Sequence, residues 1–520
     1  MLQAKGGFMA QINVSNLTFG YEGSYDNIFE NVSFSIDTNW KLGFIGRNGK
    51  GKTTFLNLLL GKYEYQGSIT KTAVFDYFPY RVNDAKDLDK TADELMGKWK
   101  LQVENWRVLC ELGQLEIDAE LLYRPFGTLS FGERTKVMLA VLFSGENDFL
   151  LIDEPTNHLD QNAREIIKKY LASKKGFILV SHDRDLLDAC VDHVPVLNRT
   201  SIEVQSGNFT SWWENKEKAD NFAKAENEKH IKEIGKLKAA ADRSAHWADK
   251  NENTKIGYDP IKENDRSIST RAYIGAKTKK MQSRVKSYEA RIGREIEEKE
   301  GLLSDIETIK DLKIMPLTHY KERLIECTNF SLKYADGDKM VISGLDFELK
   351  QGERVLLKGK NGCGKSSLIK HILKRNAMQN NDLNVTKILT TGTFSVAPNL
   401  IISYIDQDTS HLSGKLKDYA DRHNIDYTML LSILRSLDME RVQFEKNIEE
   451  FSEGQKKKVL IAASLLTPAH IYIWDEPLNY IDVFSRMQIE TLIERFKPTM
   501  LVVEHDVRFM EKLATRVVEL

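Results

Sequence analysis

The sequence lacks several features that would place it in other classes of protein. Its four cysteines, Cys110, Cys190, Cys327 and Cys363, lie far apart without a Cys-x-x-Cys pair, which argues against a disulfide framework or a zinc site. It contains no run of about 18 apolar residues, and its N-terminus has no apolar core typical of a signal peptide. The net charge is only -2, so the average gives no indication of nucleic-acid binding and charged patches must be sought locally. We expect a cytoplasmic protein that neither spans a membrane nor is secreted.

The chain is long enough for more than one domain. Its 520 residues exceed the roughly 250–300 at which one hydrophobic core stops growing, so at least two domains are expected. Hydrophobic residues make up 41% of the sequence, which is enough to fill both cores.

Two segments match the phosphate-loop pattern Gly-x-x-x-x-Gly-Lys-[Ser/Thr]. They are GRNGKGKT (46–53) and GKNGCGKS (359–366), and each follows a short apolar run and leads into a helical pattern. In such a unit, backbone N–H groups close around phosphate oxygens, while Lys52 or Lys365 neutralises the β- and γ-phosphates. Because both flanks fit twice, ATP binding is favoured over a Gly-rich turn. The residues expected to contact ATP here are Gly46, Asn48, Gly49, Gly51, Lys52, Thr53, Thr54, Gly359, Asn361, Gly362, Gly364, Lys365, Ser366 and Ser367.

A buried apolar strand that ends in Asp-Glu follows each loop, in FLLIDEPTNHLD (149–160) and IYIWDEPLNYID (471–482). Each aspartate is placed to hold Mg²⁺ with the hydroxyl of its phosphate loop, and each glutamate is suited to polarise the attacking water. The predicted metal-binding residues of these motifs are Thr53, Asp153, Ser366 and Asp475. The predicted general bases are Glu154 and Glu476.

A third strand ends in His-Asp in both halves, in LVSHDRDLL and VVEHDVRFM. This places His182 and His505 where they can contact the γ-phosphate and take part in catalysis, although a lone histidine is more often structural. The spacing between equivalent residues is nearly constant along the chain. The chain is therefore predicted to be a tandem duplication of one ATP-binding domain.

LSFGERTKV (129–137) and FSEGQKKKV (451–459) resemble the LSGGQ signature of ATP-binding-cassette proteins. The resemblance implies head-to-tail cassettes, with each ATP between the phosphate loop of one and the signature of the other. The signature residues that would contact ATP are Ser130 and Gly132 for the second loop, and Ser452, Gly454 and Gln455 for the first. Tyr21 and Tyr334 stand where the family stacks an aromatic ring on adenine, although an aromatic there is as often core.

The two halves also depart from the family pattern. Phe131 and Glu133 replace the usual Gly and Gln of the first signature, and Glu453 replaces a Gly in the second. Gln407 fits the family's glutamine near the metal and ATP, whereas the first half offers Tyr80. The two ATP sites are therefore expected to be unequal.

The segment between the cassettes matches neither of them and reads as a helical hairpin. Apolar residues recur every three or four positions from Ile231 to Ala248 and from Met281 to Ile296, which predicts two amphipathic helices. A polar loop with Gly257 and Pro260 lies between them. The predicted organisation is an α/β fold with two tandem ATP-binding-cassette domains, 9–210 and 317–520, joined by a long α-helical hairpin linker, 211–316, with a tip loop at about 251–270.

The beginning of the second linker helix is strongly basic, because residues 271–294 contain eight basic side chains and one acid, Glu289. A charge run can be merely a solvated helix face, but the low acid content and the projecting linker favour contacts with RNA phosphates. The predicted RNA-binding residues are Lys255, Arg271, Lys277, Lys279, Lys280 and Arg284.

Tandem cassettes with a charged helical linker and no membrane domain resemble the ABC-F class of translation factors. Within it, GFILVSHDR, the linker's AENEK and YIWDEPLNYIDV are similar to Lsa-type antibiotic-resistance proteins. That resemblance implies a monomeric ATPase that binds the ribosomal exit site as its ATP form. Its linker would reach ribosomal RNA and tRNA near the peptidyl-transferase centre and relieve inhibition by lincosamides, pleuromutilins and streptogramin A. A housekeeping translation factor and the ATPase subunit of a membrane exporter remain alternatives.

Overall fold

The computed structural model describes most of both halves and the first linker helix. The described residues are 11–21, 27–46, 51–70, 73–82, 85–100, 104–145, 148–157, 159–197, 202–253, 283, 286–288, 290–294, 312–334, 340–360, 362–379 and 388–520. We call the part before residue 209 the first cassette and the part from residue 312 onward the second cassette.

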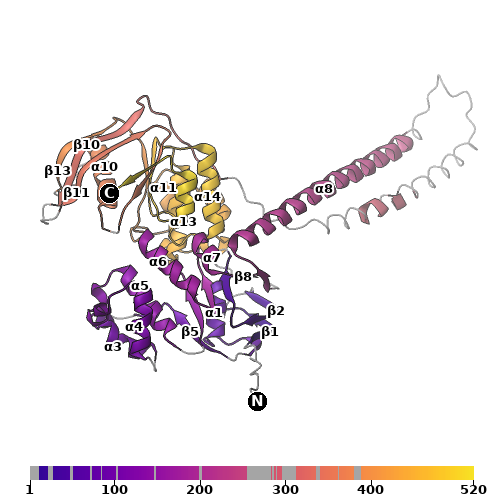
Figure 1. The fold of residues 1–520 in the computed structure, drawn as a ribbon. Helices are drawn as coiled ribbons and strands as arrows, with labels where there is room; N and C mark the ends of the chain where they lie inside the picture. Colours follow the sequence, from indigo (N-terminus) through magenta and orange to yellow (C-terminus); the bar gives the residue numbers. More distant parts are fainter. Residues whose placement is uncertain are drawn as a thin grey trace, which may run out of the picture. The chain divides into compact units, whose positions relative to one another are not determined.

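The first cassette is built on a six-stranded, mainly parallel sheet in the order β5-β6-β7-β3-β8-β9, beside a three-stranded antiparallel sheet in the order β2-β1-β4 (Figure 1). Strand β7 reads FILV and is buried along its whole length, as expected of a strand inside a parallel sheet. The strands are β1 (Gln11–Phe19), β2 (Phe29–Asp37), β3 (Lys41–Phe44), β4 (Gln66–Thr70), β5 (Val74–Phe78), β6 (Asp148–Asp153), β7 (Phe177–Val180), β8 (His193–Leu197) and β9 (Ile202–Ser206).

The helices of the first cassette fall into two groups. Helix α1 follows the first phosphate loop, and α6 and α7 follow the Asp-Glu and His-Asp strands. A group between β5 and β6 ends in the helix of the signature, α5. The helices are α1 (Lys52–Leu59), α2 (Ala85–Leu88), α3 (Ala92–Trp99), α4 (Asn105–Gln114), η1 (Ala119–Tyr123), η2 (Phe126–Thr128), α5 (Phe131–Phe143), α6 (Gln161–Ser173) and α7 (Arg184–Cys190).

The second cassette repeats this plan with a parallel sheet in the order β14-β15-β16-β12-β17 and an antiparallel sheet in the order β11-β10-β13. Tyr472 and Trp474 on β15 are completely buried and anchor its core. Its strands are β10 (Arg323–Tyr334), β11 (Met340–Lys350), β12 (Arg354–Lys358), β13 (Ile388–Val396), β14 (Ile402–Ile405), β15 (Ile471–Asp475), β16 (Met500–Val503) and β17 (Arg516–Glu519).

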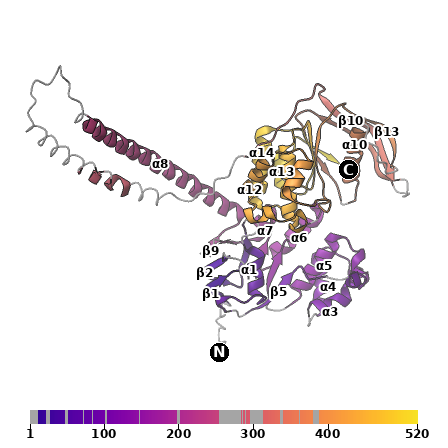
Figure 2. The same cartoon turned by 180° about the vertical axis from the view of Figure 1, so that it is seen from behind.

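Helices α12, α13 and α14 of the second cassette are seen together in Figure 2. Helix α13 is nearly all buried beyond its first turn, which explains its high content of Ala, Leu and Ile. The helices are α10 (Lys365–Gln379), α11 (Leu416–Arg422), α12 (Tyr427–Ser436), η3 (Arg441–Glu445), η4 (Ile448–Glu450), α13 (Glu453–Leu466), α14 (Val483–Phe496) and α15 (Val507–Leu513).

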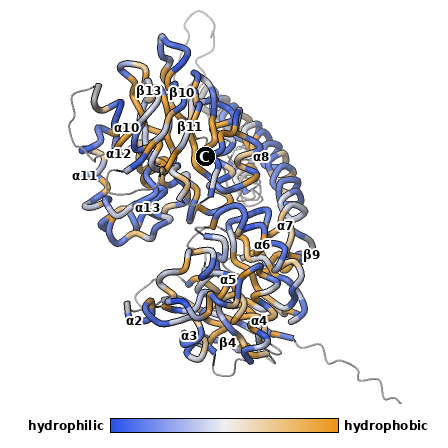
Figure 3. The backbone as a smooth tube through the Cα atoms, turned by 60° about the vertical axis from the view of Figure 1, so that its left-hand side comes forward, coloured by the Kyte–Doolittle hydropathy of each residue, from blue (hydrophilic) through white to orange (hydrophobic). Residues whose placement is uncertain are grey.

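Helix α8 (Phe209–Asn253) begins directly after the first cassette and is 45 residues long. It is mostly hydrophilic (Figure 3). Ile234 is buried, but Ile231 is 58% exposed, so the predicted amphipathic pattern is wrong at that position. Residues 290–294 are also helical, and Ile292 there is buried.

The chain divides into two compact units. One comprises Met1–Trp212 and Ile309–Leu520, and therefore both cassettes, and the other comprises Trp213–Thr308. Among the described helices, none is long and apolar enough to cross a membrane.

Candidate functional sites: two phosphate loops and their partners

The first phosphate loop joins β3 to α1 through a tight backbone turn. Gly51 has a φ of +90°, and a Cβ at this position would lie 2.5 Å from the side chain of Ile28, so no other residue fits without a shift. Lys52 is 8% exposed, and its Nζ donates a hydrogen bond to the carbonyl of Gly46. Burial lowers the pKa of Lys52, while the nearby charge of Glu154 opposes that shift.

The second loop, between β12 and α10, has the same construction. Gly364 has a φ of +109°, and Lys365 is 7% exposed. Its Nζ donates to the carbonyls of Gly359 at 2.8 Å and Lys360 at 3.1 Å. Each lysine thus sits at the mouth of its loop, where a phosphate could take the place of the carbonyls. Three predicted loop residues lie outside the described part of the chain: Asn48, Gly49 and Asn361.

The two predicted adenine-stacking tyrosines occupy equivalent positions beside the loops. The hydroxyl of Tyr21 lies 2.9 Å from Oγ1 of Thr54, and that of Tyr334 lies 2.8 Å from Oγ of Ser367. Tyr21 is 45% exposed and Tyr334 is 37% exposed, so neither ring belongs to a core. Tyr21 also meets Phe19 and Tyr63 edge-on, with ring centroids 5.2 and 5.7 Å away, and stacking of either tyrosine on adenine remains a prediction.

The predicted metal-binding carboxylates meet the hydroxyls of their loops. Thr53 Oγ1 donates to Asp153 Oδ2 at 3.0 Å, and a hydrogen bond from Ser366 acts on Asp475. Burial raises the pKa of Asp475 to about 6. Its Oδ1 is buried without a hydrogen-bond partner among the described residues, an arrangement that suits a bound cation or its water.

The predicted general bases stand on an unusual backbone turn. Glu154 and Glu476 have φ values of +51° and +48°, and their N–H groups donate to Val180 and Val503 at the ends of the neighbouring strands. Non-glycine residues with such φ values are strained and cluster at functional sites. Burial, followed by the charge of Asp153, raises the pKa of Glu154 to about 8.

The switch histidines face these bases in both cassettes. Nε2 of His182 lies 3.4 Å from Oε1 of Glu154, and Nε2 of His505 lies 3.7 Å from Oε1 of Glu476. Burial, followed by the charges of Lys52 and Arg486, lowers the pKa of His182 well below its ordinary value and so favours the neutral ring.

The second base has two side-chain donors that have no counterpart at Glu154 among the described residues. Gln407 Nε2 donates to Glu476 Oε2 at 2.9 Å, and Asn479 Nδ2 donates to the same oxygen at 2.7 Å. Tyr80, which the sequence offers in place of Gln407, instead donates to Asp76 at 2.7 Å and stacks on Trp99 with a ring distance of 5.2 Å. The asymmetry expected from the sequence therefore extends to the hydrogen bonds around the bases.

Each signature serine begins its helix in a capping box. Ser130 caps α5 with Glu133, and Ser452 caps α13 with Gln455. A pocket of about 420 Å³ beside the second loop is lined by Lys365, Ser366, Gln407, Glu476 and Tyr334, and also by Phe131 of the first signature. The pairing of Gly132 with the second loop and of Gly454 with the first remains a prediction.

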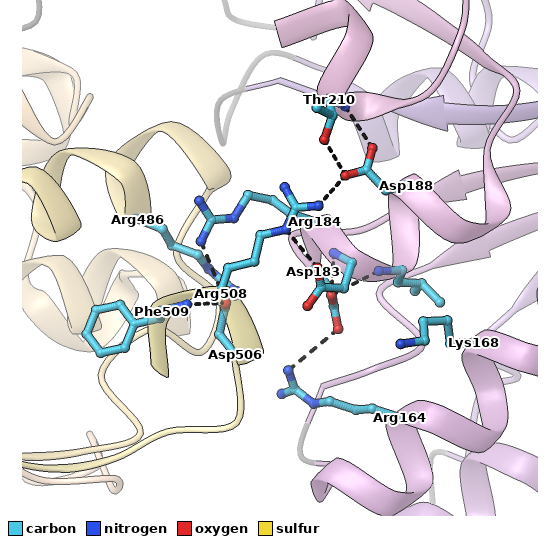
Figure 4. Close-up of polar contacts among 12 residues, drawn as sticks. Arg164, Lys168, Asp183, Arg184, Asp188, Thr210, Arg486, Asp506, Arg508 and Phe509 are labelled. Atoms are coloured by element: carbon cyan, nitrogen blue, oxygen red, sulfur yellow. Dashed lines mark hydrogen bonds and ion pairs between the residues drawn. The ribbon is translucent and has the colours of Figure 1, made fainter. Parts of the chain in front are cut away.

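Sequence reasoning missed the ion pairs that join the two cassettes (Figure 4). Arg184 on α7 donates to both carboxylate oxygens of Glu490 on α14, and Arg508 on α15 donates to Asp185 and Asp188 on α7. Both arginines lie within three residues of a switch histidine, and this short spacing is the only sequence signal that could have indicated them.

The predicted RNA-binding residues Lys255, Arg271, Lys277, Lys279, Lys280 and Arg284 all lie outside the described residues.

Comparison with known proteins follows the same division into two cassettes. The family model described as ABC transporter matches residues 29–157 and 342–479, which together make up about half of the chain. The sequence is 27% identical over 497 residues to the ribosome protection protein VmlR of Bacillus subtilis, covering 95% of this chain and 84% of that protein. It is 23% identical over 565 residues to ABC transporter F family member 2 of Arabidopsis thaliana, covering 98% and 76% of the two chains.

Solved structures agree in fold. The archaeal ribosome recycling factor aABCE1, in complex with the ribosomal stalk protein aP1, superposes with a TM-score of 0.58 at 19% identity, covering 97% of this chain and 87% of that chain. Two similar domains of the same α/β architecture are thus present in both molecules, which confirms the predicted tandem-cassette fold.

Proposed function

The chain belongs to the ABC transporter family and is an ABC-type ATPase with two ATP-binding cassettes, and from this premise we propose that it works on the ribosome rather than in a membrane. Its similarity to VmlR, named a ribosome protection protein, runs through both cassettes and the linker. This continuous match over 95% of the chain is the observation that carries the proposal. Similarity to an ABC transporter F family member supports the ABC-F resemblance of the sequence.

The proposed action is protection of translation from drugs at the peptidyl-transferase centre, namely lincosamides, pleuromutilins and streptogramin A. The ATP form would bind the ribosomal exit site, and the linker would approach ribosomal RNA and the tRNA near the drug. The length of α8 supports this role, since 45 helical residues at about 1.5 Å each extend for roughly 70 Å. The basic residues of 271–294 would supply phosphate contacts.

In this proposal, ATP binding completes both sites and hydrolysis ends the ribosome-bound state. Lys52 and Lys365 would bind the phosphates, and Glu154 and Glu476 would each orient and deprotonate the attacking water. The buried Oδ1 of Asp475 and the hydroxyl–carboxylate pair of Thr53 and Asp153 fit Mg²⁺ held with ATP. When bound, the ion would neutralise phosphate charge. Within the described residues, no cluster of three His, Cys, Asp or Glu side chains could hold a metal, and in this proposal the nucleotide phosphates supply the other ligands.

The decisive experiment combines ribosome pelleting with in vitro translation in the presence of a lincosamide. The wild-type protein should restore translation. The double variant Glu154→Gln/Glu476→Gln should stay on ribosomes with ATP and stop translation, because it lacks both bases but keeps the phosphate-binding groups. A matched control is Glu203→Gln/Glu440→Gln, which changes two exposed carboxylates and should behave like wild type.

Three results would contradict the proposal in different ways. Weaker pelleting of the double glutamine variant than of wild type would refute the ATP-bound ribosome complex. Normal pelleting without rescue of drug-treated translation would favour a housekeeping translation factor. No pelleting at all, with ATPase activity that responds to membrane vesicles, would favour the exporter subunit.

A further inference from the structure

The two cassettes differ in the residues that follow β5 and β14, the strands that pair with the Asp-Glu strands β6 and β15. In the sheet register, Phe78 pairs with Ile152 on β6, and Ile405 pairs with Trp474 on β15, so Tyr80 and Gln407 occupy equivalent positions. Gln407 reaches Glu476 in its own site. Tyr80 is committed elsewhere, since its hydroxyl donates to Asp76 and its ring stacks on Trp99. Among the described residues of this loop, none donates a hydrogen bond to Glu154 as Gln407 does to Glu476.

A different tyrosine reaches the first site from inside the strand. Tyr77 on β5 donates its hydroxyl to Asp153 Oδ2 at 3.1 Å, and Thr53 donates to the same oxygen at 3.0 Å. Two donors on one oxygen fix the rotation of the carboxylate and leave its other oxygen for a ligand. Lys62 lies over the Tyr77 ring at 4.9 Å and helps to hold it in place.

The equivalent tyrosine of the second cassette does not make this contact. Tyr404 pairs with Ile473 as Tyr77 pairs with Leu151, but among the described residues it makes no hydrogen bond to Asp475. Burial, followed by the charges of Asp406 and Asp475, raises the pKa of its hydroxyl. The position of Asp406 corresponds to Pro79 in the first cassette, where proline offers no carboxylate, and the hydroxyl of Tyr77 donates to Asp153 instead.

We propose that Tyr77 is a positioning residue of the first ATP site, which orients Asp153 for the Mg²⁺ that accompanies ATP and compensates for the missing loop glutamine. This rests on the proposed role of Asp153 in holding the ion. A hydroxyl donor keeps Asp153 Oδ2 occupied and directs Oδ1 toward the cation or its water. The second site obtains its order from Gln407 and Asn479 on the base, so its Mg²⁺ dependence does not involve a tyrosine.

The test measures how the binding of a fluorescent ATP analogue to the purified protein depends on Mg²⁺, without ribosomes. Lys365→Ala confines the signal to the first site. In that background, Tyr77→Phe should raise the Mg²⁺ concentration at half-saturation by about three- to tenfold, since a hydrogen bond to a charged group is lost. Binding of the nucleotide without Mg²⁺ should not change, because the phosphate loop is untouched.

Two matched controls define the outcome. Tyr404→Phe in the same background should leave the Mg²⁺ midpoint unchanged, and Tyr77→Phe in a Lys52→Ala background should leave the second site unchanged. An unaltered Mg²⁺ midpoint in Tyr77→Phe would overturn the proposal. A joint decrease in nucleotide binding without Mg²⁺ and in melting temperature would also overturn it, because it would indicate a purely structural role for Tyr77. A wild-type protein that binds nucleotide equally well without Mg²⁺ would remove the premise about Asp153, while the ribosome assays would still report on the proposed function.

Discussion

Lys458 and Asp482 form a buried ion pair in the second cassette. Lys458 and Asp482 are 3% and 0% exposed in their side chains, and their charged atoms lie 3.0 Å apart. Asp482 also accepts the N–H and the hydroxyl of Ser485 at 2.9 Å each, and Lys458 donates to the carbonyl of Leu437. Because every polar atom of this pair has a partner, removing one of the two residues should lower the free energy of unfolding by more than the intact pair contributes to it.

Asp482→Asn should therefore destabilise the second cassette by about 3–5 kcal/mol, since Lys458 would remain buried without a counterion. The measurement is thermal unfolding at pH 7. A suitable control is Asp160→Asn, the equivalent helix cap in the first cassette, which is only half-buried and should cost little, because asparagine caps a helix about as well as aspartate. Similar losses in the two variants would contradict this view of the buried pair.

The same pair predicts a pH dependence. Burial alone would raise the pKa of Asp482, but Lys458 and the hydrogen bonds outweigh it and lower the pKa below its ordinary value. A lowered folded-state pKa stabilises the fold above the unfolded-state pKa, about 4, and this contribution is lost as the pH falls through the folded value. The difference in melting temperature between wild type and Asp482→Asn should accordingly narrow in acid.

The sequence could propose residues for each candidate ATP site but not the neighbours that position them. Asp153 ends β6, His182 follows β7, and Lys52 begins α1 after the loop that follows β3, and parallel strands bring such ends to one edge of a sheet. Tyr77 and Asp188 belong to no local pattern. Their roles depend on partners 76 and 320 residues away, which only the folded chain identifies.

The signature helices α5 and α13 differ in the hydrogen bonds of the serine that caps each of them. At α13, Gln455 accepts the Ser452 N–H at 2.9 Å. At α5, Glu133 accepts both the N–H and the hydroxyl of Ser130, each at 2.7 Å. The hydroxyl proton of Ser130 is thus directed to a carboxylate of its own helix. If this serine faces the γ-phosphate of the second site, it presents lone pairs and a nearby negative charge.

Glu133→Gln should therefore raise ATP turnover at the second site by about three- to tenfold, because a charge-assisted hydrogen bond becomes a neutral one, a difference of about 1 kcal/mol. The assay is steady-state hydrolysis in a Glu154→Gln background, where only the second base remains. The reverse change, Gln455→Glu in a Glu476→Gln background, should lower turnover at the first site. Identical rates before and after both changes would show that the signature serines do not contact the nucleotide as predicted.

For helix α8, the sequence pattern predicts the helix but not the residue at which it begins. Its apolar spacing predicted a helix that includes Ile231 and Ala248, and the described helix is longer at its start, running from Phe209 to Asn253. Thr210 and Ser211 in its first turn are held by Asp188 and Asn208. Apolar residues at every third or fourth position indicate the helix, but its first residue depends on capping partners, of which Asp188 is distant in sequence.

At the scale of the whole molecule, the two cassettes and the first turn of α8 meet at one carboxylate. Asp188 Oδ1 accepts the N–H of Thr210 at 2.7 Å, and its Oδ2 accepts the Thr210 hydroxyl at 2.5 Å and Arg508 of the second cassette. Arg508 lies three residues after His505, and Asp188 lies six after His182. The first turn of the linker helix is therefore bonded to the same group that bonds the second cassette (Figure 4).

Because this carboxylate is shared, we predict that a substitution in the second cassette changes the stability of the first turn of α8. Arg508→Ala should accelerate hydrogen exchange of the amides at 209–212 by about tenfold, because Asp188 loses the charge that holds it beneath the helix. Asp188→Ala should accelerate the same amides at least as much, and the double variant should exchange no faster than Asp188→Ala alone, since both changes remove one linked set of bonds. The control is Lys512→Ala on the same helix α15, whose partner Glu494 belongs to its own cassette. If Arg508→Ala leaves the exchange at 209–212 at the level of Lys512→Ala, or if the effects of the two substitutions simply add, Asp188 does not link the second cassette to the linker helix.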